Sequence, residues 1–93
     1  MMNNRRSSVQ VMADILRLGE AGKTEIMYSA NMSYRQLQKY LEFLVNGEFL
    51  ERIIVPNPGV KYKVTAKGTR LLQSIESMLG LLGLSEEEVQ HHL

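Results

Sequence analysis

One stretch decides the fold of this 93-residue chain: IMYSANMSYRQLQKYLEFL, which runs from Ile26 to Leu44. Within it, Ser33 is followed three residues later by Gln36. This is the spacing of a capping box, in which each side chain hydrogen-bonds the backbone N–H of the other residue. The stretch therefore predicts a helix that starts after Ser33 and ends near residues 46–47, an Asn-Gly pair that favours a stop.

This predicted helix has an apolar face and a polar face. Leu37, Leu41 and Leu44 recur at helical spacing and should face a core. At about 100° per residue, the cations and amides then point the other way. Arginine and glutamine can pair with guanine and adenine, while lysine and tyrosine can hold phosphates. The candidate recognition residues are Ser33, Tyr34, Arg35, Gln36, Gln38 and Lys39. The alternative interpretation is an ordinary solvated helix face.

Two further helices are predicted ahead of this one. Ser7 or Ser8 can cap a first helix, whose apolar residues recur at helical spacing up to a Gly-flanked loop at residues 19–22. Thr24 is the predicted N-cap of a second, short helix that ends at a turn around Asn31, a residue suited to a left-handed conformation. The chain thus contains a helix, a turn and a capped helix in succession.

A β-hairpin follows. Residues 49–55 are rich in apolar and β-branched side chains, Pro56-Asn57-Pro58-Gly59 interrupts them, and residues 60–65 alternate with period two. Val60, Tyr62 and Val64 should share an inner face and the intervening lysines an outer one. The hairpin cations expected to grip a DNA backbone are Arg52, Lys61 and Lys63. Protection of an exposed strand edge is the alternative role.

The last predicted helix opens at Thr65 or Ala66 and carries more apolar surface than a small core needs. Its apolar residues follow spacings of four, three and four, with a second pair seven apart alongside, which is typical of a coiled coil. We interpret them as a dimer seam; a helix folded back onto its own domain is the alternative. The candidate interface residues are Leu71, Leu72, Ile75, Met78, Leu79 and Leu82.

Charge is distributed unevenly along the chain. The net charge is only +1, but all 11 Lys and Arg and 6 of the 10 acidic residues lie in residues 1–70. The other 4 acids lie in residues 71–93, which hold no Lys or Arg. The basic part is therefore the expected anion-binding part. Arg5 and Arg6 form a basic N-terminal arm that can reach a minor groove, or that only solubilises the terminus.

Composition excludes several classes of function. The chain has no cysteine, and its two histidines are adjacent near the C-terminus, so we expect no disulfide and no metal site. No Cys nucleophile, internal histidine or glycine-rich phosphate loop suggests catalysis or a cofactor. No apolar run is long enough to span a bilayer or to act as a signal peptide, so we expect a cytoplasmic, nucleoid-associated protein.

The stretch from Ile26 to Leu44, together with Tyr62-Lys63-Val64-Thr65-Ala66-Lys67-Gly68, resembles the small archaeal winged-helix transcriptional regulators. The resemblance covers roughly residues 9–79, although the second run identifies only the winged-helix superfamily. It implies a winged-helix body and a C-terminal helix that pairs with a partner in an antiparallel coiled coil. This chain departs from the family in having two glycines late in the last helix and an acidic tail.

We therefore predict a mainly α fold with a small β-hairpin, an α+β winged helix-turn-helix with a long C-terminal dimerisation helix. Residues 1–6 should be a flexible basic arm, 7–70 the winged-helix DNA-binding domain, and 71–93 the dimerisation helix and acidic tail. The predicted function is sequence-specific binding of double-stranded DNA by a homodimer that regulates transcription, with no small-molecule ligand. The alternatives are a non-specific architectural protein of chromatin and a winged helix that binds other proteins.

Overall fold

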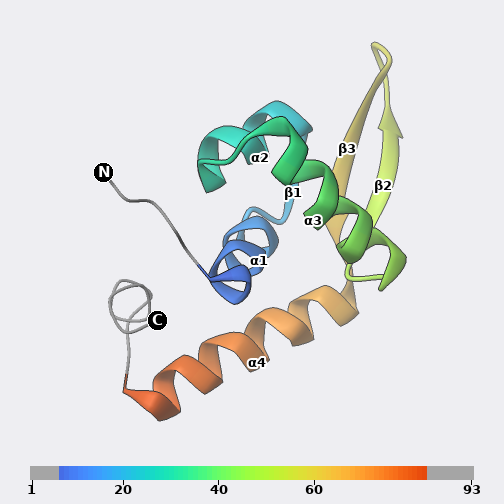
Figure 1. The fold of residues 1–93 in the computed structure, drawn as a ribbon. Coiled ribbons are helices and arrows are strands. Elements are labelled where there is room, and N and C mark those ends of the chain that lie inside the picture. Colours follow the sequence, from blue (N-terminus) through green and yellow to red (C-terminus); the bar gives the residue numbers. More distant parts are fainter. Residues whose placement is uncertain (1–6, 84–93) are drawn as a thin grey trace.

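Helix α3, Tyr34–Asn46, begins at the predicted capping box in the computed structural model, which describes residues 7–83 (Figure 1). The Ser33 hydroxyl accepts a hydrogen bond from the Gln36 backbone N–H at 3.2 Å. In return, the Gln36 side-chain oxygen accepts one from the Ser33 backbone N–H at 3.1 Å. The helix ends at the predicted stop with Gly47 as its C-cap, although the left-handed residue there is Glu48, with φ of 66°.

The other described elements precede and follow α3 along the chain. In chain order the described elements are α1 (Ser8–Arg17), β1 (Glu20–Ala21), α2 (Lys23–Ala30), α3, β2 (Leu50–Val55), β3 (Gly59–Val64) and α4 (Ala66–Leu82). Ser7 caps α1 and forms a second capping box, with Gln10. The prediction for α2 was wrong at its start: its N-cap is Gly22 rather than Thr24, because the chain enters the helix directly from β1. Asn31 ends α2 in the predicted left-handed conformation, with φ of 53°.

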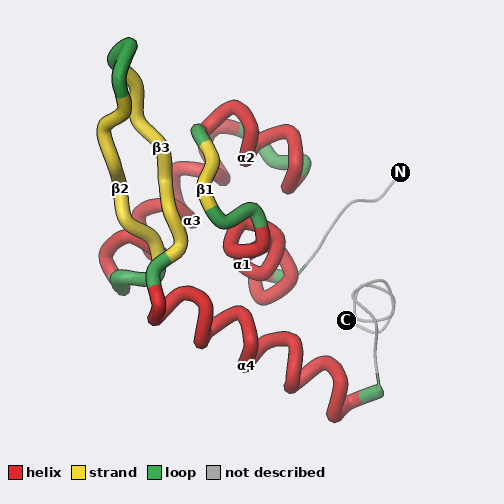
Figure 2. The backbone as a smooth tube through the Cα atoms, turned by 180° about the vertical axis from the view of Figure 1, so that it is seen from behind, coloured by secondary structure: helices red, strands yellow, loops and turns green. Residues whose placement is uncertain are grey.

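The predicted hairpin is present as β2 and β3, and a third strand joins it. Strand β1 pairs antiparallel with β3, so the strand order is β1-β3-β2. Figure 2 shows β1 between β3 and the helices α1 and α2. The sequence predicted only a loop there, because a two-residue strand is too short to show an alternating pattern. The small sheet is therefore completed by a contact between distant segments.

Helices α1 to α3 and the sheet enclose the main core. Its buried residues are Val11, Ile15, Leu16, Ala21, Ile26, Ala30, Leu37, Leu41, Leu44, Leu50 and Tyr62. The three α3 leucines predicted to face the core are among them. Their burial turns the opposite, polar face of α3 toward solvent.

Helix α4 packs along α1 through a smaller cluster made by Ala13, Ile75 and Leu79. Arg17 of α1 also donates from Nε to the Glu76 carboxylate of α4 at 3.1 Å. Because α1 covers Ile75 and Leu79, they face their own chain instead of the predicted dimer seam. No helix within residues 7–83 is long and apolar enough to cross a membrane.

The other residues of the predicted seam are divided. Leu71 and Leu72 are half-buried against both clusters, whereas Met78 and Leu82 are 43% and 61% exposed. Leu81, which we did not predict, is 90% exposed. The apolar surface of α4 therefore lies toward its C-terminal end. The domain boundary predicted after residue 70 falls inside this helix.

The Thr-Ala-Lys-Gly run at residues 65–68 fixes the start of α4 against the loop after α3. Thr65 caps the helix by accepting from the Gly68 N–H at 3.0 Å, and its hydroxyl donates to the Glu48 carbonyl at 2.6 Å. Lys67 donates to the Gly47 carbonyl at 2.8 Å and lies over the Phe49 ring, 4.8 Å from its centroid. Each polar residue of the run thus has a bond that ties α4 to the loop.

Candidate nucleic-acid interface

The exposed face of α3 is cationic near the N-terminus of the helix. All six predicted recognition residues are exposed: Ser33, Tyr34, Arg35, Gln36, Gln38 and Lys39. Ser33 and the Gln36 side-chain oxygen are engaged in the capping box, which leaves the Gln36 amide nitrogen for another partner. Arg35 and Lys39 lie one turn apart, while Glu42 is exposed further along. An anionic ligand would therefore meet the first two turns of α3 most favourably.

Lys23, the first residue of α2, joins this surface, although no sequence pattern singled it out. Its ammonium donates to the Tyr34 hydroxyl at 3.4 Å and lies 5.4 Å from the centroid of the same ring. A cation over an aromatic face is attracted by the partial negative charge that the quadrupole of the neutral ring places on that face. Only the packing of α2 against α3 brings these two residues together, which is why sequence reasoning missed Lys23.

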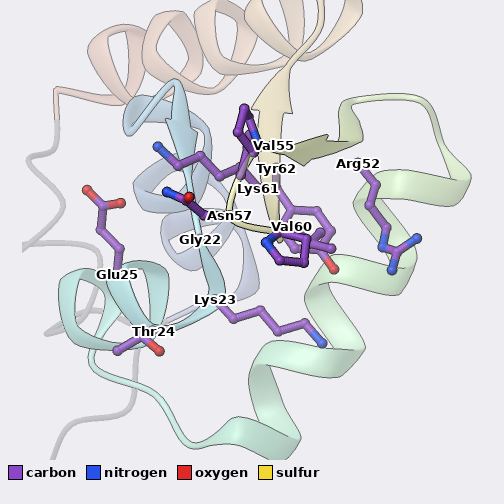
Figure 3. A pocket seen from close by; sticks show the side chains of 13 residues that line it. Gly22, Lys23, Thr24, Glu25, Arg52, Val55, Asn57, Val60, Lys61 and Tyr62 are labelled. Atoms are coloured by element: carbon purple, nitrogen blue, oxygen red, sulfur yellow. The ribbon is translucent and has the colours of Figure 1, made fainter.

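Arg52 of β2 lies where two surface hollows meet. One hollow of about 600 Å³ is open between the start of α2, at Lys23, and the tip end of the hairpin. The other, of about 290 Å³, lies between α3, at Gln38 and Lys39, and the middle of the hairpin, at Arg52 and Tyr62. Arg52 and Tyr62 line both. Figure 3 shows the side chains of Lys23, Arg52 and Tyr62 extending toward α3.

The three hairpin cations that we predicted as one contact lie on opposite faces of the sheet. Arg52 is directly across from Tyr62, and Ile53 is directly across from Lys61. Because alternate strand residues point to opposite faces, Arg52 shares the inner face with Tyr62, and Lys61 and Lys63 share the outer face. Figure 3 shows Lys61 extending away from Arg52. The strand register thus separates Arg52 from the two lysines.

The outer face of the sheet is nearly balanced in charge. Lys63 lies across from Glu51 on β2 and from Glu20 on β1. The Lys61 ammonium is 4.0 Å from the Glu20 carboxylate. Although exposed pairs of this kind contribute little stability, the two carboxylates offset the two ammonium charges. The outer face therefore attracts an anion less than the lysines alone suggest.

Several other predicted features lie outside the part of the chain that the structure describes. Arg5 and Arg6, the acidic residues 86–88 and the two adjacent histidines lie outside residues 7–83. Within that range, no group of three or more His, Cys, Asp or Glu is placed to hold a metal ion. The surface instead offers N–H donors and positive charge from α2, α3 and β2.

Comparison with known proteins places the whole arrangement in context. A family model described as winged helix-turn-helix matches residues 5–82. The chain is 31% identical over 81 residues to the uncharacterized protein MJ0287 of Methanocaldococcus jannaschii. That match covers 84% of this chain and 78% of MJ0287.

Solved structures share the fold. The crystal structure of Sso10a-2, a DNA-binding protein from Sulfolobus solfataricus, matches with a TM-score of 0.75 and 31% identity. The match covers 84% of this chain and 83% of Sso10a-2. A mutant MarR from E. coli complexed with operator DNA matches with a TM-score of 0.67 and 22% identity, over 89% of this chain and 66% of the MarR chain. At that identity, the similarity to MarR is one of fold alone.

Proposed function

Because this chain belongs to the winged helix-turn-helix family, we propose that it binds double-stranded DNA with sequence preference and regulates transcription as a homodimer. The exposed N-terminal half of α3 carries the proposal, because it combines cations and amides and has no acidic residue between Tyr34 and Leu41. The 31% identity to Sso10a-2, which is named as a DNA-binding protein, supports it. The proposed role is non-enzymatic.

In the proposed complex, α3 enters the major groove through its first two turns. Arg35 and Gln38 have the side chains that pair with guanine and adenine edges. Lys39 and Tyr34 contact phosphates on either side, which fixes the helix in register without carrying sequence information. Glu42 limits how far along α3 the DNA contact extends, because its carboxylate repels phosphate.

The exposed end of α4 supports the proposed homodimer. Met78, Leu81 and Leu82 form an apolar surface that the described part of the chain leaves uncovered. Figure 1 shows this end of α4 extending past α1. A second copy of the chain would cover this surface with an equivalent one, as in an isologous dimer. The burial of Ile75 and Leu79 against α1 confines the proposed seam to this end of the helix.

Fluorescence anisotropy with random and genomic duplexes across a salt series tests the proposal. We expect salt-sensitive binding, because each phosphate contact releases counterions, and tighter binding to a subset of genomic duplexes. Equal binding to all duplexes would replace the regulator with a non-specific architectural protein. Absence of binding at low salt would reject DNA as the partner and favour a protein-interaction module.

A further inference from the structure

We propose that Lys23 and Arg52 form a phosphate clamp, which holds the DNA backbone beside α3, and that Lys61 and Lys63 of the outer sheet face do not contact the DNA. The proposal rests on the proposed function and identifies which cations carry the backbone contact. Of the three hairpin cations predicted from the sequence for that contact, Arg52 is retained, and Lys23 of α2 replaces Lys61 and Lys63.

The position of Arg52 is the first argument. It lies on the inner face of the sheet, opposite Tyr62, and lines both hollows beside α3. Lys23 lines the larger of these hollows, and Lys39 of α3 lines the smaller one. Lys61 also lines the larger hollow, but its ammonium lies 4.0 Å from the Glu20 carboxylate. A backbone that follows the two hollows would thus pass Lys23, Arg52 and Lys39 in turn, beside the helix proposed to read the bases.

The contacts of Lys23 are the second argument. Its ammonium is held at the Tyr34 hydroxyl and over the Tyr34 ring, both of which are uncharged. An ammonium has three donors, so the bond to Tyr34 leaves donors for a phosphate oxygen. Tyr34 therefore positions the charge at the start of α3 without neutralising it.

The distribution of acidic groups is the third argument. Among residues 7–83, no ion pair within 4.0 Å involves Lys23 or Arg52, whereas Lys61 lies at that distance from Glu20. The carboxylates that line the two hollows are Glu25 and Glu42. Figure 3 shows Glu25 extending away from Lys23 and Arg52, and Glu42 lines only the hollow beside α3. Within the described residues, Lys23 and Arg52 thus line the hollows without an ion-pair partner within 4.0 Å.

The test compares two double variants of the full chain. Each removes two positive charges, one pair from the hollows beside α3 and the other from the outer face of the sheet. Lys23→Gln/Arg52→Gln removes the phosphate clamp, and Lys61→Gln/Lys63→Gln is the matched control. Each phosphate contact contributes about 0.9 to the slope of log affinity against log salt, so the clamp variant should lose about 1.8 from that slope. Between 50 and 200 mM salt, the fold-loss of affinity of the clamp variant should therefore be about one tenth of the fold-loss of the wild type. The control should keep the wild-type slope.

The outcomes separate this proposal from the one on which it rests. If the wild type binds DNA and the clamp variant keeps its slope, the phosphate clamp is rejected while DNA binding stands. An equal loss of slope in both variants would also reject it, because the effect would then follow total charge instead of position. Absence of wild-type binding at low salt would overturn both proposals. The charge-preserving variant Arg52→Lys should retain the wild-type slope. Thermal unfolding of each variant would reveal a folding defect.

Discussion

Gly68 shows how a single residue sets the start of α4. A Cβ built on it would overlap the Phe49 carbonyl oxygen and would lie 2.7 Å from a methyl group of Val64. The same carbonyl accepts a hydrogen bond from the Thr65 N–H at 3.1 Å. A backbone atom cannot move aside as a flexible side chain can, so glycine is required here for close packing and not for a positive φ.

Gly68→Ala should therefore lower the free energy of unfolding by about 1–3 kcal/mol, the usual cost of overpacking. Gly80→Ala is the matched control in the same helix, because nothing lies within 4 Å of its built Cβ. This variant should raise the free energy by about 0.5–1 kcal/mol, since alanine is the better helix former. Urea denaturation measures both values, and similar effects at the two glycines would contradict the packing argument.

Arg35→Ala tests the recognition residue with the strongest expected effect. Removing a bidentate contact to guanine should weaken binding to preferred duplexes by about 1–3 kcal/mol and weaken binding to random duplexes less. The ratio of the affinity for preferred duplexes to the affinity for random duplexes should therefore decrease. Arg70→Ala removes the same charge from α4, away from α3, and should leave the preference intact. Competition anisotropy measures both ratios, and an unchanged preference in Arg35→Ala would show that Arg35 does not read bases.

At the scale of elements, α4 shows the limit of reading a helix from its periodicity. The sequence indicated two apolar strips, and one strip had to cover the core while the other remained free. The structure assigns Ile75 and Leu79 to α1 and leaves Met78, Leu81 and Leu82 exposed. Periodicity could not make this assignment, because it does not specify the rotation at which α4 packs on α1.

Leu81→Ser/Leu82→Ser should convert the proposed dimer to a monomer at micromolar concentration. Burial of each leucine contributes about 1.5–3 kcal/mol, so the loss of both should raise the dimer dissociation constant at least a hundredfold. Ile54→Ser is the control, since Ile54 is 77% exposed on β2 and lies away from α4. Sedimentation velocity gives the molecular mass of each variant. A dimer that persists in the double variant would place the interface elsewhere.

The hairpin shows the converse, since its period of two was sufficient to place its faces. Tyr62 is buried and Lys61 and Lys63 are exposed, as the alternation predicted. The sequence did not reveal how β2 aligns with β3, and this register decides that Arg52 lies opposite Tyr62. Consequently the lysines were predictable as an exposed pair, but the separation of Arg52 from them was not.

At the scale of the whole molecule, the proposed DNA surface and the proposed dimer surface lie at different ends. Figures 1 and 2 show the hairpin tip and the C-terminal end of α4 projecting in different directions. A dimer through α4 would therefore keep both α3 helices available. The symmetry of such a dimer would place two recognition helices on two half-sites of one duplex.

Half-site spacing tests this arrangement. Starting from a preferred duplex with two half-sites, inserting either 5 or 10 base pairs between them should weaken binding. The reason is that a dimer with a fixed distance between its two α3 helices fits one spacing, whereas 5 base pairs turn one half-site to the opposite side and 10 base pairs move it about 34 Å away. Anisotropy titrations of the three duplexes measure the difference. Equal affinities for all three duplexes would mean that each chain binds DNA independently.

The sequence by itself determined the elements whose evidence is local. The Ser33–Gln36 capping box set the start of α3, and the repeat of Leu37, Leu41 and Leu44 set its faces, because both depend on residues within a few positions of each other. The tertiary structure alone decided the contacts between distant segments. These are the pairing of β1 with β3, the approach of Lys23 to Tyr34 and the packing of α4 on α1. The burial of apolar surface around a shared core sets these contacts, and no local pattern encodes how separate elements rotate and align against one another.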